Sequence, residues 1–91
     1  MSKKHKQKKV IFSIMAPEAQ CVQLAGDFNS WDPDAHHLER TTDEKWEIKL
    51  NLTPGRHEYK FVVDGKWHND PNCSDLAANP FGGENSVLIL K

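Results

Sequence analysis

The sequence has no long apolar segment and few cysteines, and both shortages limit what the protein can be. No stretch of its 91 residues approaches the roughly 20 consecutive apolar residues of a membrane-spanning helix. The lysine-rich start, residues 1–9, contains no apolar run of its own, and we expect no secretory signal. Two cysteines, Cys21 and Cys73, allow at most one disulfide, and we expect two free thiols in a cytoplasmic protein.

Positive charge is scarce outside the first nine residues. The net charge of the chain is −1, but residues 1–9 hold five of its twelve basic residues. Without them, seven basic residues stand against thirteen acidic ones, a balance of −6. An acidic body disfavours a face that binds nucleic acid. We expect residues 1–9 to be a disordered basic tail and residues 10–91 to form one domain.

An amphipathic helical pattern is also missing, because no window repeats apolar residues at helical spacing. The dominant period is two, most clearly over 46–52, where every second residue from Trp46 to Leu52 is apolar. Similar or shorter apolar patterns predict strands over 10–14, 22–24, 58–63 and 87–90, with a weak strand over 38–41. Short strands separated by turns rich in proline, glycine and aspartate predict an all-β sandwich of antiparallel strands.

The Asp64-Gly65 pair predicts a tight hairpin, because both residues tolerate the positive φ angles of a type I′ turn. A two-residue loop at this place pairs Val63 with Lys66, Val62 with Trp67, Phe61 with His68 and Lys60 with Asn69. Side chains alternate between the two faces of a strand. The core face should therefore hold Tyr59, Phe61 and Val63, and the outward face Lys60, Val62, Trp67 and Asn69.

The three tryptophans are expected to have different roles. Trp46 shares the buried phase of its strand and is assigned to the core. Trp31 lies in a polar loop, and Trp67 faces outward beside Lys60. Such a tryptophan suits a sugar, because a pyranose packs its C–H face on an indole while its hydroxyls need polar partners. The residues alone leave a second interpretation open, in which Trp67 packs beneath the 72–83 loop or Trp31 closes the end of the sandwich.

Two segments resemble motifs of a known family. Residues 22–31 (VQLAGDFNSW) and 55–67 (GRHEYKFVVDGKW) resemble the two motifs of the glycogen-binding domains of AMP-activated protein kinase β subunits. Asp70-Pro71 and the segment 85–87 also fit. The resemblance covers nearly the whole chain from Val10. It is a resemblance to carbohydrate-binding module family 48, which branching and debranching enzymes carry as an N-terminal domain.

The resemblance implies an immunoglobulin-like β-sandwich that binds α-1,4-linked glucans such as glycogen, starch or malto-oligosaccharides. By position, Trp31 and Trp67 match the stacking tryptophans of the family. Lys60 matches a lysine that hydrogen-bonds sugar hydroxyls, and Asn85 matches a polar contact near the last strand.

The sequence departs from the kinase domains at two positions. Phe81 falls where they carry a leucine that inserts against the curved glucan, so the apolar contact is kept with another shape. Gly83 falls where they carry a threonine, so the resemblance implies that one hydroxyl is missing from the site.

No residue pattern favours an enzyme or a metal site. Glycoside hydrolysis needs two carboxylates at a set separation, and no motif marks any of the thirteen acidic residues as catalytic. Adjacent His36 and His37 point to opposite faces if they lie on a strand, which disfavours joint metal binding.

We therefore expect non-catalytic binding of α-1,4-linked glucan through Trp31, Lys60, Trp67, Phe81 and Asn85. This interpretation includes no catalytic residue, metal, cofactor, nucleic acid or membrane partner. The alternative is a protein-interaction module of a glycogen-metabolism or kinase-like assembly, because aromatic patches also serve protein interfaces.

Overall fold

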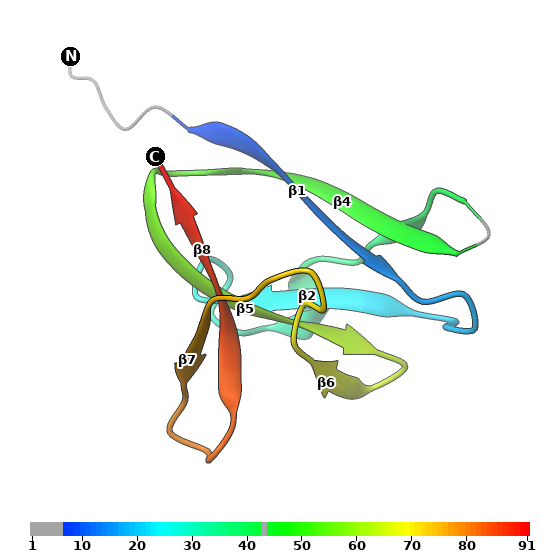
Figure 1. Ribbon diagram of the computed structural model, residues 1–91. Coiled ribbons are helices and arrows are strands. Elements are labelled where there is room, and N and C mark those ends of the chain that lie inside the picture. Colours follow the sequence, from blue (N-terminus) through cyan, green and yellow to red (C-terminus); the bar gives the residue numbers. More distant parts are fainter. Residues whose placement is uncertain (1–6, 43) are drawn as a thin grey trace.

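The computed structural model describes residues 7–42 and 44–91. Within them, two antiparallel sheets form a β-sandwich (Figure 1), which confirms the predicted fold class. The first sheet has the order β1–β4–β3, with β1 (Lys8–Met15), β4 (Lys45–Leu52) and β3 (Glu39–Arg40). The second has the order β2–β5–β8–β7, with β2 (Val22–Gly26), β5 (Gly55–Val63), β8 (Glu84–Leu90) and β7 (Leu76–Ala78). Strand β6 (Lys66–His68) pairs with the C-terminal part of β5.

The element boundaries differ from the predicted ones in a few places. Strand β1 begins at Lys8, so Lys8 and Lys9, which the sequence assigned to the tail, pair with Leu52 and Asn51. Residues 1–6 of the expected tail lie outside the described residues. Strand β7 was not expected, because its three residues show no apolar alternation. A 3₁₀ turn at Pro33–Ala35 is short, and no helix in the described part of the chain could cross a membrane.

The β5–β6 hairpin confirms the predicted turn and most of the predicted register. Asp64 and Gly65 have φ angles of 49° and 83°, as a type I′ turn requires. The observed pairs are Val63–Lys66, Val62–Trp67 and Phe61–His68. The ladder ends there, so the expected Lys60–Asn69 pair is wrong. Strand β8 pairs with the preceding residues of β5, Gly55–Tyr59, and its Ser86 lies opposite Tyr59.

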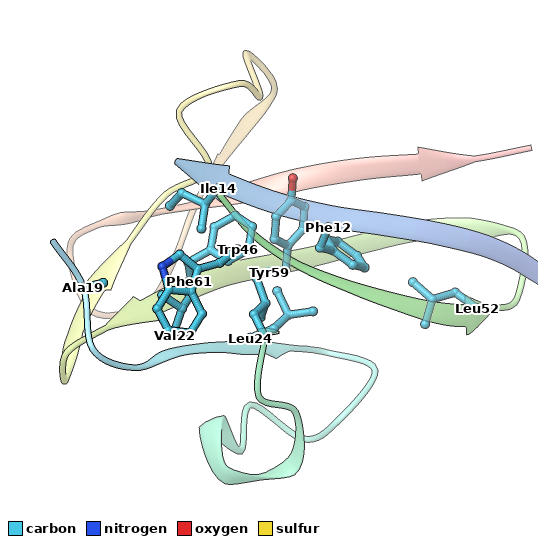
Figure 2. Close-up of a cluster of buried hydrophobic side chains, with 10 residues drawn as sticks. Phe12, Ile14, Ala19, Val22, Leu24, Trp46, Leu52, Tyr59 and Phe61 are labelled. Carbon is cyan, nitrogen blue, oxygen red and sulfur yellow. The ribbon is translucent and has the colours of Figure 1, made fainter. Parts of the chain in front are cut away.

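The core lies between the two sheets and contains Trp46, as predicted. Figure 2 shows Trp46 and Phe12 from the first sheet packed toward Tyr59 and Phe61 from the second. The Phe12 and Tyr59 rings meet edge to face with centroids 4.9 Å apart. The Trp46 indole donates a hydrogen bond of 3.0 Å from Nε1 to the Ala16 carbonyl, so its polar atom is satisfied although the ring is buried.

Tyr59 fixes the segment that follows β6 to the second sheet. Its hydroxyl donates a hydrogen bond of 2.7 Å to Asp70 Oδ2, and the Asp70 backbone N–H donates to Ser86 Oγ at 2.9 Å. Burial of the phenol, with Asp70 beside it, raises the pKa of Tyr59 far above its usual value. The hydroxyl therefore stays protonated and keeps donating, which holds the end of β6 in place.

Candidate functional site

The second sheet carries a cleft of about 660 Å³. Its walls come from the loop after β2, the β5–β6 hairpin and the β7–β8 loop, and in Figure 1 the β7–β8 loop projects away from β1 and β4. The lining residues are Asp27, Trp31, Glu58, Lys60, Trp67, Asn79, Pro80, Phe81 and Asn85. All five residues that the sequence singled out for binding thus line one cleft.

Trp67 offers its indole to the cleft from the short strand β6. The side chain is 47% exposed, and it lies on the outward face of the hairpin with Lys60. Trp67 is therefore not packed beneath the 72–83 loop. Val62 lies directly opposite Trp67 and so has the predicted outward phase, but it is buried to 3% exposure, which the sequence did not predict.

Trp31 reaches the cleft from a loop with an unusual backbone. Both Ser30 and Trp31 have a φ of 59°, a left-handed conformation that costs about 1–2 kcal/mol for each residue with a side chain. Asn29 stabilises this loop, because its Oδ1 accepts from the Gly26 N–H at 3.0 Å and its Nδ2 donates to the Leu24 carbonyl at 3.0 Å. The Trp31 N–H adds a bond of 2.9 Å to the Gly26 carbonyl.

The neighbouring residue Phe28 closes the sandwich in place of Trp31. Phe28 packs against the core cluster, with its ring 5.8 Å from that of Phe12. A Cβ at Gly26 would come within 2.5 Å of the Phe28 ring and 2.8 Å of the Glu58 carbonyl, so only glycine fits there. This contact leaves Trp31, which is half-buried, free to line the cleft.

Lys60 brings a positive charge to the cleft from β5. Its ammonium group donates a hydrogen bond of 2.9 Å to the Glu84 carbonyl, which directs the side chain along the wall toward β8. An ammonium group has three N–H bonds, so two can still serve a ligand. The anchored lysine can therefore donate to hydroxyl groups without first being ordered.

Glu58 and Asn85 form a polar wall that the sequence only partly predicted. The Asn85 Nδ2 donates to Glu58 Oε1 at 3.0 Å, and Arg56 donates to the other carboxylate oxygen. The hydrogen bond from Asn85 has the larger effect and that from Arg56 the smaller, and together they hold the pKa of Glu58 below its usual 4.5. Asn85 is only 8% exposed, so it meets a ligand with an amide that is already partly engaged.

Phe81 stands at the tip of the loop between β7 and β8. Its side chain is 92% exposed, far more than any other large apolar residue of the described chain. Gly82 makes the turn possible with a φ of 88°, and the Asn79 N–H donates to the Gly83 carbonyl at 2.9 Å. An aromatic ring held in solvent in this way is costly to leave uncovered and is suited to a ligand.

The sequence did not predict four of the lining residues: Asp27, Glu58, Asn79 and Pro80. Glu58 shares the outward phase of β5 with Lys60, so the alternation could have indicated it. Asp27 accepts from the Glu58 N–H at 2.9 Å and lies 3.4 Å from His57 Nδ1, contacts that join two distant segments. Asn79 sits in a turn, and nothing in its local pattern indicates the cleft.

The cleft combines apolar rings with fixed hydrogen-bonding groups. Trp31, Trp67 and Phe81 supply flat apolar surfaces, and Lys60 and the Glu58–Asn85 pair supply a donor and acceptors. In residues 7–42 and 44–91 no group of three histidine, cysteine or acidic side chains could hold a metal ion. The arrangement suits a neutral ligand with apolar faces and a hydroxyl rim.

Comparison with known proteins identifies the family. The profile of carbohydrate-binding module 48, the isoamylase N-terminal domain, matches residues 1–82. The chain is 35% identical over 82 residues to the chloroplastic protein FLOURY ENDOSPERM 6 of Oryza sativa subsp. japonica, covering 90% of this chain and 15% of that protein. It is 39% identical over 83 residues to the 1,4-alpha-glucan branching enzyme GlgB of Lactobacillus acidophilus, covering 86% and 12%.

Further similarities extend to a kinase subunit and to a solved structure. The chain is 36% identical over 70 residues to the 5'-AMP-activated protein kinase subunit beta-1 of Sus scrofa, covering 77% of this chain and 54% of the kinase subunit. The crystal structure of the maltogenic amylase from S. marinus superposes with a TM-score of 0.82 at 24% identity, covering 94% of this chain and 14% of the amylase. At this sequence identity, the superposition shows that the two proteins share a fold.

The chain thus corresponds to one part of these larger proteins, spanning 12–15% of the rice protein and the branching enzyme. The residues that the family profile matches contain most strands of the two sheets. The chain belongs to carbohydrate-binding module family 48.

Proposed function

We propose that the cleft binds α-1,4-linked glucan chains without acting on them chemically. The observation that supports this most is the convergence of Trp31, Trp67 and Phe81 with Lys60 and Asn85 on one cleft. A glucan presents successive pyranose faces to the rings and its hydroxyls to the polar wall. The chain's similarity to a 1,4-alpha-glucan branching enzyme supports this class of ligand.

The affinity of such a site is modest. The cleft is open, and few polar groups converge on each sugar. The conformational entropy that the glucan loses on binding therefore offsets much of the favourable free energy of stacking. We expect a dissociation constant between roughly 10 μM and 1 mM, or about −4 to −7 kcal/mol.

The state of the cleft carboxylates supports a role without catalysis. A retaining or inverting glycosidase needs one carboxyl group with a raised pKa, because that group must deliver a proton to the leaving oxygen. In Glu58 the pKa is lowered instead, since Asn85 and Arg56 stabilise the charged form. Asp27, the other carboxylate of the lining, accepts from the Glu58 backbone N–H. Glu58 is therefore stabilised as a carboxylate and is not arranged as a proton donor.

We also propose that the protein works in a reducing compartment such as the cytoplasm. Cys21 and Cys73 are both free thiols, and free thiols persist where glutathione and thioredoxin keep cysteines reduced. The chloroplastic relative from rice allows a second reducing compartment.

Titration with maltoheptaose tests the binding proposal. Calorimetry should detect binding at millimolar ligand or below, and tryptophan fluorescence should change over the same range. Cellohexaose, a glucan with β-1,4 linkages, is the matched control and should bind much more weakly because its straight chain cannot follow the same rings. Absence of heat and of any fluorescence change at millimolar maltoheptaose would refute the proposal and favour a protein ligand for the aromatic groups.

A further inference from the structure

The side chain of Asn79 forms the centre of the loop that carries Phe81. Its Oδ1 accepts two backbone hydrogen bonds, from the N–H of Phe81 and the N–H of Gly83, both at 3.0 Å. A backbone N–H can only donate, so the orientation of the amide is determined by these contacts. One side chain thus spans the turn from its first residue to its last.

Phe81 depends on this loop for its position. At 92% exposure its ring has almost no packing partner, so the core does not hold it. The tip also contains Gly82 at a φ of 88°, and glycine leaves the unrestrained backbone free to adopt many conformations. The side-chain hydrogen bonds of Asn79 therefore restrain where the ring stands, together with the backbone bonds from the Asn79 N–H to the Gly83 carbonyl at 2.9 Å and from the Gly82 N–H to the Asn79 carbonyl at 3.4 Å.

The same amide connects the loop to the strand that carries the rest of the cleft. Asn79 Nδ2 donates to Asn85 Oδ1 at 3.1 Å, and Asn85 Nδ2 donates to Glu58 Oε1 at 3.0 Å. The carboxylate of Glu58 can only accept, so the direction of the whole chain of bonds is set at both ends. Strand β5 carries Glu58 and Lys60 and pairs with β6, which carries Trp67.

We propose that Asn79 is a positioning residue for glucan binding, which holds Phe81 over the cleft through Oδ1. The proposal rests on the proposed function of the cleft. Asn79 acts before the ligand arrives: it orders the loop in advance, so less freedom is lost when the glucan binds. The link to Asn85 makes a smaller contribution by fixing the base of the loop.

A double-mutant cycle on maltoheptaose affinity tests the proposal. Phe81→Ala and Asn79→Ala should each weaken binding roughly threefold to tenfold, the range expected when one side chain is lost or no longer ordered in advance. Because Asn79 acts through Phe81, the double variant should bind within about twofold of Phe81→Ala alone. Asn51→Ala on β4, in the other sheet, is the matched control and should bind like the wild type.

Asn79→Asp separates the two bonds of the amide. The carboxylate keeps the acceptor for both loop N–H groups but removes the donor to Asn85. Its affinity should lie within about threefold of the wild type. An Asn79→Asp variant as weak as Asn79→Ala would overturn the proposal, as would losses that multiply fully in the double variant. A wild-type chain that fails to bind maltoheptaose would refute the proposed function along with this inference, whereas normal wild-type binding with independent losses refutes the inference alone.

Discussion

Val62 and Trp67 lie directly opposite each other on β5 and β6, yet Val62 is 3% exposed and Trp67 47%. Side chains opposed in this way project from the same face, with Cβ atoms about 4.5–5.5 Å apart. We infer that one part of the indole covers the valine while the rest remains available in the cleft. Trp67 therefore both covers part of the outer surface of the sheet and lines the cleft.

Trp67→Ala should weaken maltoheptaose binding by at least about tenfold, because a central stacking ring is lost. Its effect on stability should be small, about 0.2–1 kcal/mol, which is the usual value of a cross-strand pair such as that with Val62. Trp31→Ala should weaken binding similarly. Calorimetric titration and urea unfolding of the same samples measure both effects. If Trp67→Ala unfolded as readily as a core variant, the assignment of Trp67 to the binding surface would be wrong.

Trp46→Ala should have the opposite profile. It removes a buried indole from the small core and should cost roughly 3–5 kcal/mol, which can unfold a domain of this size. Trp46→Phe is the graded control: an aromatic ring is kept, but the bond to the Ala16 carbonyl and part of the buried indole volume are lost. The Ala16 carbonyl also accepts from the Ala19 N–H, so the cost should come mainly from the lost volume and be smaller than that of Trp46→Ala. Thermal melts followed by circular dichroism measure the stabilities, which should decrease from the wild type to Trp46→Phe to Trp46→Ala. The folded fraction of Trp46→Phe should bind glucan with wild-type affinity.

Lys60→Ala should reduce affinity less than either cleft tryptophan. One hydrogen bond from a partly solvated ammonium group contributes about 0.5–1.5 kcal/mol, or roughly threefold to tenfold in affinity. Lys60→Met keeps the apolar stem and removes only the charge and the bond to the Glu84 carbonyl. The two variants should bind alike in a maltoheptaose titration. A Lys60→Met variant with wild-type affinity would show that the ammonium group does not contact the sugar.

Lowering the pH should reduce the contribution that the Glu58 carboxylate makes to the free energy of unfolding. Its pKa is lower in the folded chain than the usual 4.5, so the charged form stabilises the fold fully above about pH 4.5. This contribution disappears as the pH falls through the lowered value. Thermal melts should show the wild type more stable than Glu58→Gln at pH 7, with the difference shrinking toward zero in stronger acid. A difference that stayed constant from pH 7 to pH 3 would contradict the assignment.

Local patterns were sufficient to predict the sandwich and part of the cleft. The period-two alternation of β4 placed Trp46 in the core, and Asp64-Gly65 predicted the pairing of Val62 with Trp67. Both inferences depend on neighbours in sequence, where strand geometry is regular. The outward phase of Lys60 followed from the same geometry.

The remaining features depend on contacts that strand alternation and turn residues do not indicate, some of them between distant segments. The burial of Val62 requires a covering residue from another strand, and the left-handed backbone at Trp31 requires the bonds of Asn29. The polar wall joins Asn79, Asn85 and Glu58 from a turn and two strands. No short-range pattern of residue types encodes such a meeting, so it became visible only with the structure.

The described cleft takes its lining from the second sheet and its loops, and none of the lining residues belongs to the buried core cluster. Mutations that alter ligand preference can therefore accumulate on this surface while the packing between the sheets stays the same. This separation of the lining from the core makes the chain a practical scaffold for selecting new sugar specificities from libraries confined to the three wall segments.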